Sequence, residues 1–295
     1  MIENPMPWPQ GKRAAVSFSF DVDADSILRV AHPADATNRA STLSYLRYGP
    51  EVAVPRLCKL FEGYGLKATF FIPGWCAEEY PRMVERVAEG GHEIAHHGYL
   101  HEQPMLQSPD RERYWTERAM NALERRTGRR PVGYRAPYYA FSRVTADILA
   151  EMGFFYDSSL MADDVPYLIE TPSGRRLVEI PVHWSVDDWA QYMNNFDLDY
   201  IMPIQPPRKA IEVYWADFDA LYEWGGFLEF VWHPFISGRP ARVKAIAGFI
   251  ERVLEKGDVW IATSEEIARH ARELIDRGAY RPRIDKLPYA EAKLD

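Results

Sequence analysis

The fold and the chemistry of this sequence are both decided around residues 91–102, Gly-His-Glu-Ile-Ala-His-His-Gly-Tyr-Leu-His-Glu, which hold four of the eight histidines. The first part of the stretch predicts a buried strand, and the second carries His97 and His101, four residues apart. On a helical turn this spacing would place both imidazoles on one face, where they can bind one metal ion. A hydrolytic zinc site commonly adds a carboxylate ligand and an open position for water. The stretch therefore predicts two metal ligands next to the end of a strand.

The missing carboxylate is expected upstream, where another predicted strand runs into acidic residues. Residues 16–20, Val-Ser-Phe-Ser-Phe, alternate apolar and polar side chains as a strand does, and Asp21, Asp23 and Asp25 follow them. Acidic side chains at the carboxyl end of a strand can point into a pocket. We therefore expect the rest of the chain to be a scaffold that brings these two stretches together.

Strand and helix signals alternate along the whole chain. Apolar runs predict strands, and helical periodicity bounded by Gly, Pro and capping residues predicts the helices between them. The expected strands are 16–20, 67–72, 92–96, 131–136, 154–157, 177–180, 227–232 and 259–262, and the expected helices are about 52–64, 81–90, 109–128, 142–153, 208–224, 243–257 and one that starts at the Thr263–Glu266 capping box. This alternation favours an α/β fold with a mostly parallel sheet closed into a barrel.

The absence of any break in composition predicts one domain over residues 1–295. Its core is expected at about 14–270. Residues 26–50 are too long for a simple connection and are expected to cover one end of the fold. Residues 279–295 are expected to form a polar tail.

The composition excludes several classes of partner and location. A formal net charge of −8 argues against nucleic acid and against an anionic membrane. Residues 1–9 have neither a basic start nor an apolar run, and no stretch is long enough to span a membrane, so a cytoplasmic protein is expected. The two cysteines, Cys58 and Cys76, imply no disulfide framework and are interpreted as buried packing residues.

Chemically capable side chains gather at five predicted strand ends. In βα folds, these positions face the site where function collects. They are Asp21, Asp23 and Asp25, then His97 and His101, then Arg135, then Asp157, and then His233. A lone His or Asp is more often a cap or a satisfied polar group, so it is their joint placement that predicts a site.

These stretches resemble the five motifs of the polysaccharide deacetylase family, the carbohydrate esterases similar to nodulation-type chitooligosaccharide deacetylases. The motifs occur in the family's order and cover nearly the whole chain. They are Phe20-Asp21-Val22-Asp23, His97-Gly98-Tyr99-Leu100-His101, Arg135-Ala136-Pro137, Asp157-Ser158-Ser159 and Val231-Trp232-His233-Pro234. The resemblance implies a distorted (β/α) barrel with fewer than eight strands and a divalent metal cofactor, with zinc as the first expectation.

Two departures from the motifs make the chain look like a cytosolic subgroup of the family. The aspartates of the first motif are separated by Val22, and the fourth motif lacks its usual tryptophan. This subgroup includes cyclic imide hydrolases, metal-independent allantoinases and peptidoglycan deacetylase-like proteins. Because this chain keeps the complete Asp/His/His set, metal dependence is expected here. The subgroup tends to form homo-oligomers, often tetramers, and the nine Trp and seventeen Tyr also favour an interface, so a homo-oligomer is expected.

The metal and the base are assigned to the first three motifs. Asp23, which corresponds to the second aspartate of the family motif, is expected to bind the metal together with His97 and His101. Asp21 is expected to be the general base, because an amide is a poor electrophile and the attacking water must be activated. Arg135 could hold Asp21 ionised and oriented.

The acid is assigned to the last motif. His233 is expected to protonate the leaving nitrogen, and Asp157 could pair with His233 and keep it charged. His92 and His96 are interpreted as structural, because His96 faces the opposite side of its strand from His97. Residues 183–189, which include two tryptophans and two aspartates, could line a pocket or merely pack.

The leading functional hypothesis is a metal-dependent hydrolase of amide bonds other than peptide bonds. The substrate is either an N-acetylated amino sugar or glycan, as in the family's name, or a small cyclic imide or ureide, which suits a cytosolic enzyme with a cover at residues 26–50. A binding protein with a vestigial site is the hypothesis from a different class. The complete set of candidate ligands and base argues against it.

Overall fold

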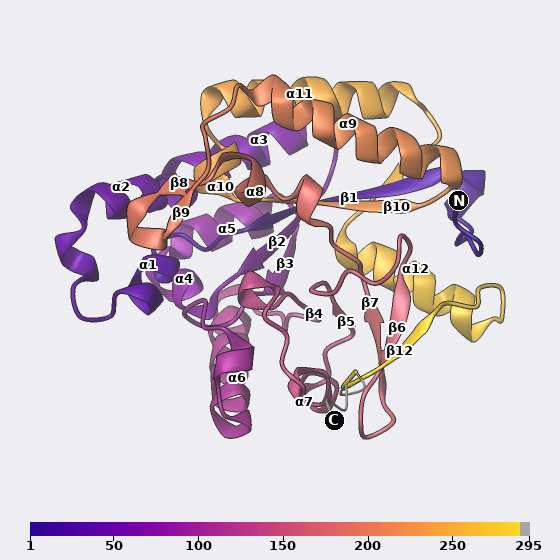
Figure 1. Ribbon diagram of the computed structural model, residues 1–295, viewed down its shortest axis with the longest axis horizontal. Coiled ribbons are helices and arrows are strands. Elements are labelled where there is room, and N and C mark those ends of the chain that lie inside the picture. Colours follow the sequence, from indigo (N-terminus) through magenta and orange to yellow (C-terminus); the bar gives the residue numbers. More distant parts are fainter. Residues whose placement is uncertain (290–295) are drawn as a thin grey trace, which may run out of the picture.

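The computed structural model describes residues 1–289, and its largest element is a ten-stranded sheet (Figure 1). The strand order is β10–β1–β2–β3–β4–β5–β7–β6–β12, and β11 also pairs with β1. The strands are β1 Ala14–Asp21, β2 Thr69–Ile72, β3 Glu93–His96, β4 Gly133–Tyr134, β5 Tyr156–Asp157, β6 Tyr167–Glu170, β7 Arg176–Glu179, β10 Phe227–Trp232, β11 Val259–Ile261 and β12 Ile284–Lys286.

Every pairing from β10 through β1 to β7 is parallel, and β6 and β7 form an antiparallel hairpin. The α/β fold with a parallel, barrel-like sheet is therefore confirmed, and the parallel run has fewer than eight strands. Among residues 1–289 no ladder joins the two ends of this sheet. A single bridge between Asp187 and Val231 brings the segment after β7 against β10, and this narrows the gap between the two ends of the parallel run.

Helices cover the sheet and fill the connections between strands. They are α1 Ser26–Ala31, α2 Ala40–Tyr48, α3 Val54–Tyr64, α4 Gly74–Glu79, α5 Pro81–Glu89, α6 Pro109–Thr127, α7 Thr145–Met152, α8 Asp188–Tyr192, α9 Pro207–Trp224, α10 Pro234–Ser237, α11 Pro240–Glu255 and α12 Ser264–Asp276. Figure 1 shows α9 and α11 side by side above β1 and β10. A small hairpin of β8 (Asn194–Asn195) and β9 (Tyr200–Ile201) stands apart from the main sheet.

The two faces of the central strands differ in chemistry. On the face toward α3, α9 and α11, Phe18 of β1 stacks on Phe230 and Trp232 of β10, and all three are buried in the main core. Full burial of each such ring contributes about 2–3 kcal/mol. The opposite face, which encloses the interior of the barrel-like sheet, carries buried polar groups such as Ser19 and Glu229. Because side chains alternate along a strand, one face of the sheet packs into the hydrophobic core and the other carries a polar network.

Most of the predicted elements are present, and the differences lie at their boundaries. The capping box of Thr263 and Glu266 starts α12 as expected. Ser142 was expected to begin a helix, but α7 starts three residues later, and the Ser142 hydroxyl accepts from the backbone N–H of Thr145. The expected tail forms β12, which pairs with β6, while residues 290–295 lie outside the described residues.

The segment 26–50 is helical and packs against the β8–β9 hairpin. Arg39 and Thr42 both donate to the carboxylate of Asp197, and the Nε2 atom of His32 lies 2.6 Å from the Asp197 carbonyl oxygen. His32 is therefore only partly exposed and bonds to the hairpin. These contacts hold the hairpin in place, and the hairpin forms part of the wall of the site described next.

Candidate metal centre

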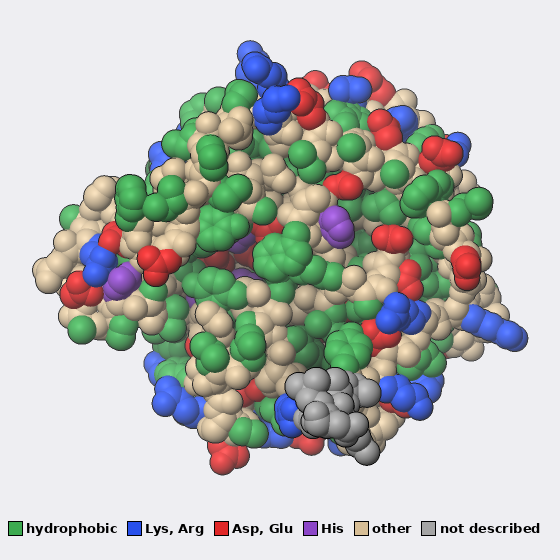
Figure 2. Space-filling model, viewed as in Figure 1, with side chains coloured by type: hydrophobic (Ala, Val, Ile, Leu, Met, Phe, Trp, Pro, Cys, Tyr) green, Lys and Arg blue, Asp and Glu red, His purple; other side chains and the backbone are tan. Residues whose placement is uncertain are grey.

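A cavity of about 210 Å³ opens at the carboxyl ends of β1 and β10. Figure 2 shows its mouth as a hollow in which acidic and histidine side chains lie behind a frame of hydrophobic ones. Its lining contains the side chains that the motifs predicted and several that they did not: Asp21, Asp23, His97, His101, Ala136, Tyr138, Tyr139, Trp184, Asp187, Trp189, Leu198, Tyr200 and His233.

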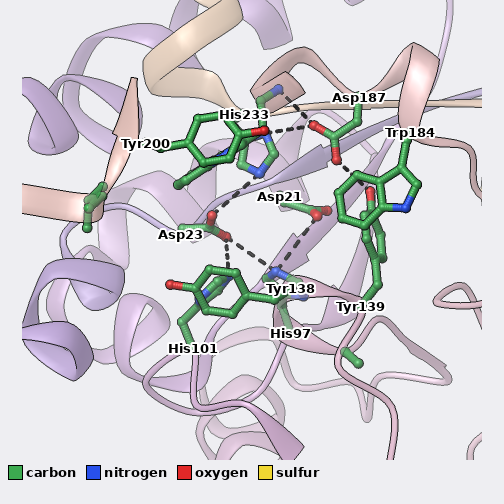
Figure 3. A pocket seen from close by; sticks show the side chains of 13 residues that line it. Asp21, Asp23, His97, His101, Tyr138, Tyr139, Trp184, Asp187, Tyr200 and His233 are labelled. Carbon is green, nitrogen blue, oxygen red and sulfur yellow. Dashed lines mark hydrogen bonds and ion pairs between the residues drawn. The ribbon is translucent and has the colours of Figure 1, made fainter. Parts of the chain in front are cut away.

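Asp23, His97 and His101 converge on one point at the floor of this cavity (Figure 3). The Nε2 atoms of His97 and His101 lie 3.3 Å and 3.4 Å from Oδ1 of Asp23. Both carboxylate oxygens of Asp23 are buried, and neither has a hydrogen-bond partner among the described residues. A buried carboxylate without hydrogen bonds is costly, and a cation held between these three ligand atoms would remove that cost. The residues therefore fit a divalent metal with an Asp/His/His ligand set.

The neighbouring groups set the protonation states that such a metal needs. Burial would raise the pKa of Asp23, but the neighbouring imidazoles of His101, His97 and His233 hold it well below its usual value. Burial lowers the pKa of His101 to about 4, so its imidazole is neutral near pH 7. Nδ1 of His97 lies 2.8 Å from the Arg135 carbonyl oxygen, which places the proton on Nδ1 and leaves Nε2 free to bind.

The loop that carries the histidines is not the helical turn expected from their spacing. Gly98 and His101 both have positive φ, 70° and 62°, and residues 97–103 form no helix. Glu102 closes the loop, because its carboxylate accepts the backbone N–H groups of Tyr99 and Leu100. The prediction of two ligands from one stretch agrees with the geometry, although a tight turn rather than a helix face brings them together.

Arg135 and Asp21 form a buried ion pair beside the three candidate ligands. Nη1 of Arg135 donates to Oδ1 of Asp21 at 2.7 Å, and Oδ2 of Asp21 lies 3.7 Å from Nε2 of His97. The pair agrees with the expected geometry of a base that is oriented by an arginine. Its free oxygen faces the cavity (Figure 3).

The prediction that Asp157 pairs with His233 is wrong. Nδ1 of His233 bonds Oδ1 of Asp188 at 2.7 Å, and the same carboxylate accepts from the His233 backbone N–H. Burial would lower the pKa of His233, but the bond to Asp188 and the charges of Asp188, Asp23 and Asp187 raise it to about 10. Nε2 of His233 is 3.6 Å from Oδ2 of Asp23, so a charged imidazole faces the candidate metal position.

Asp157 instead belongs to a buried pair of acids. Its carboxylate accepts from the hydroxyl and the backbone N–H of Ser159, and it shares a hydrogen bond with Glu179. Burial raises the pKa of Asp157 to about 6, and burial together with the Asp157 charge raises the pKa of Glu179 well above its usual value. Asp157 lies at the end of β5 as expected, but its side chain does not line the cavity.

We expect Asp188→Asn to move the alkaline limb of the pH–rate profile to lower pH and to reduce kcat by about 10²-fold or more. His233 is protonated below its raised pKa and loses its proton as the pH rises through that value. Without the Asp188 charge, the loss comes earlier. The pH dependence of kcat measures this shift. Asp157→Asn is the matched control, because it removes a buried carboxylate that does not touch His233, and an equal shift in both variants would contradict the assignment.

Aromatic side chains that the motifs did not identify wall the cavity. Tyr139 donates from its hydroxyl to Asp187 at 2.8 Å and packs edge-on against Trp184, with ring centroids 4.9 Å apart. Trp189 packs against the His233 ring at 5.3 Å. Of residues 183–189, whose role the sequence left open, Trp184, Asp187 and Trp189 therefore line the site. The only signal in the sequence was the clustering of Trp and Asp in a segment without periodicity.

His92 and His96 bind backbone groups, as a structural role requires. Nε2 of His96 lies 3.0 Å from the Thr116 carbonyl oxygen, and its Nδ1 accepts from the Gly98 backbone N–H. His92 accepts from the backbone N–H of Ala68.

No helix among residues 1–289 combines the length and the apolar character needed to cross a membrane.

Comparison with known proteins finds similarity at the level of family and of fold. Residues 42–156 match the family described as polysaccharide deacetylase. The peptidoglycan deacetylase of Helicobacter pylori is 28% identical over 85% of this chain and 94% of its own length. The peptidoglycan deacetylase-like protein FGM2 of Gibberella zeae is 30% identical over 90% of this chain and 88% of its own length.

Two solved structures resemble the whole fold. One, from Mycobacterium smegmatis and provisionally described as a polysaccharide deacetylase, is 41% identical with a TM-score of 0.91, over 100% of this chain and 99% of its own. The other, the PuuE allantoinase, is 26% identical with a TM-score of 0.80, over 92% of this chain and 95% of its own. The similarity therefore extends over nearly the full length of this chain.

Proposed function

We propose that this chain, which belongs to the polysaccharide deacetylase family, is a metal-dependent hydrolase that removes N-acetyl groups from an amino sugar or glycan. The observation that carries the proposal is the buried carboxylate of Asp23, whose oxygens lack hydrogen bonds and face the Nε2 atoms of His97 and His101. The peptidoglycan deacetylase names of two relatives support the substrate class.

The protein groups around the cavity divide the work of amide hydrolysis. A divalent ion held by Asp23, His97 and His101 would supply Lewis-acid chemistry toward water and the amide carbonyl. Asp21 takes a proton from the attacking water through the oxygen that faces the cavity, while its other oxygen stays bonded to Arg135.

His233 gives a proton to the leaving nitrogen. Asp188 keeps the imidazole charged and fixes its orientation, because it bonds Nδ1 and leaves Nε2 directed into the cavity. The reactive side chains are almost completely buried, with Asp21 3% and His233 6% exposed. In such a site, electrostatic interactions are stronger than in water.

The second candidate function is the opening of a small cyclic imide or ureide. Two observations favour it: the resemblance to the PuuE allantoinase, and a cavity of about 210 Å³ whose reactive groups are nearly closed to solvent. Both substrate classes present an amide carbonyl to the same catalytic groups. A long glycan would in addition have to reach past the exposed rings of Tyr138 and Trp184 at the mouth.

We expect acetate release from N-acetylglucosamine oligomers to exceed ring opening of succinimide, hydantoin and allantoin when kcat/KM is compared on one panel. Chelation should abolish the activity, and zinc should restore it. Faster ring opening would establish the second function. Protein purified without added zinc that holds no stoichiometric metal and turns over neither class would be a vestigial binding protein.

A further inference from the structure

Every N–H donor of the Arg135 guanidinium has a hydrogen-bond acceptor. Nε donates to the Ser158 carbonyl at 2.9 Å, Nη1 to Ser19 at 2.9 Å and to Asp21 at 2.7 Å, and Nη2 to the Ser158 hydroxyl at 2.9 Å and to Glu229 at 2.5 Å. The face of the guanidinium lies 3.9 Å from the centre of the Phe71 ring. In-plane acceptors and a stacked ring together fix both the position and the tilt of the group.

Glu229 is the charged partner of Arg135 that does not line the cavity. It lies in the middle of β10 on the polar face, is 1% exposed, and faces Arg135, which follows β4 on the other side of the barrel interior. The Ser264 hydroxyl at the start of α12 donates to the same Glu229 oxygen at 3.0 Å. A carboxylate in the middle of an otherwise aromatic and aliphatic strand has no packing reason to be there.

We propose that Glu229 is a positioning residue for the reaction, which anchors Arg135 from behind so that Arg135 holds the Asp21 carboxylate with one oxygen facing the cavity. Asp21 and Glu229 lie on neighbouring strands and bind the two ends of one guanidinium, Nη1 and Nη2. Without the Glu229 acceptor, Nη2 loses its charged partner and Arg135 can tilt. The Asp21 oxygen that meets the attacking water then moves with it.

The inference rests on the proposed function, because positioning is measured through kcat. Glu229→Met keeps the length of the side chain and removes the acceptor. We expect it to lower kcat by about 10- to 100-fold, with KM and zinc content unchanged, since small displacements of reacting groups cost rates of this size. Glu229→Gln keeps an uncharged acceptor and should lose only about 3- to 10-fold, because charge-assisted hydrogen bonds are roughly twice as strong as neutral ones.

Glu93→Met is the matched control. Glu93 is also a buried carboxylate of the barrel interior, bonded to Tyr156 and Thr69, but it does not contact Arg135. We expect this variant to keep kcat within about twofold of the wild type at equal folded fraction. Equal losses in Glu93→Met and Glu229→Met would overturn the proposal and leave only a structural role.

Two further readouts separate positioning from general damage. In an Asp21→Asn background, Glu229→Met should cost no further kcat, and an undiminished second loss would contradict action through Asp21. The Arg135 side-chain N–H signal in a ¹⁵N spectrum, assigned from its absence in Arg135→Lys, should shift or broaden in Glu229→Gln and stay in place in Glu93→Met.

The spectrum remains informative when the kinetics are not. A wild type that is inactive on every substrate overturns the proposed function alone, because the Arg135 signal still reports on the anchor. Should Glu229→Met fail to fold, Glu229→Gln carries the test, and an unchanged kcat together with an unchanged Arg135 signal overturns the inference.

Discussion

His97→Ala and His101→Ala are expected to lose zinc and, with it, essentially all hydrolytic activity. Each histidine supplies one of the three candidate ligand atoms and Asp23 supplies the third, so either change leaves two ligands for the ion. Loss of groups that only orient a ligand commonly costs 10–100-fold in metal affinity, and loss of a ligand itself should cost more than about 100-fold. Competition titration against a chromophoric chelator measures the affinity directly.

The fold should survive both replacements. The His97 and His101 side chains lie at the cavity rather than in the main hydrophobic core, and their removal relieves a crowded polar cluster. His270→Ala is the control, because His270 is half-buried beside Trp8 and Trp260, and its Nε2 lies 2.8 Å from the Pro7 carbonyl oxygen, away from the site. Stoichiometric zinc in both His97→Ala and His101→Ala would show that the ligand assignment is wrong, whatever the activity.

The sequence predicted the position of this site well because strand ends are encoded locally. Asp21 follows an alternating strand, His97 follows a buried one, and parallel strands bring their carboxyl ends to one edge. That edge is a property of the whole sheet. Residues at strand ends therefore meet without any further specification, even when they are more than a hundred positions apart, as Asp21 and Arg135 are.

The sequence could not predict the direction of a side chain at that edge. Asp157 ends β5, but it turns toward Glu179 on the neighbouring strand β7 instead of toward the cavity. Asp188 ends no strand, and it reaches His233 because the segment after β7 bridges to β10 at Asp187. Such long-range register has no local pattern in the sequence, and this is why the wrong aspartate was paired with His233.

Glu229 shows a different limit of sequence reasoning. It was included in an apolar run that correctly predicted β10, and one polar residue in a run of six does not change that prediction. The role of Glu229 becomes apparent only from the sheet register, which places Ser17 and Ser19 of β1 on the same face as Glu229. Polar residues that would weaken two strands considered separately become the interior network that holds Arg135.

Asp21→Asn and Asp23→Asn are expected to separate the roles of base and ligand. The two aspartates are two residues apart, yet Asp21 is bonded to Arg135, whereas Asp23 faces the two histidines. Asp21→Asn should therefore bind zinc as the wild type does and lose about 10²–10⁴-fold in kcat, which is the usual contribution of general acid–base catalysis. Asp23→Asn should weaken zinc binding, because an amide oxygen is a neutral and poorer ligand than a carboxylate.

The two variants act as controls for each other, because each removes one negative charge from the same buried cluster. Zinc content and single-turnover rates at saturating zinc distinguish a missing metal from a missing base. Added zinc should restore part of the activity of Asp23→Asn and none of that of Asp21→Asn. If Asp21→Asn empties the site while Asp23→Asn retains the metal, the two roles are exchanged. The hydrolytic reaction would stand, but Arg135 and Glu229 would then act on a metal ligand instead of on the base.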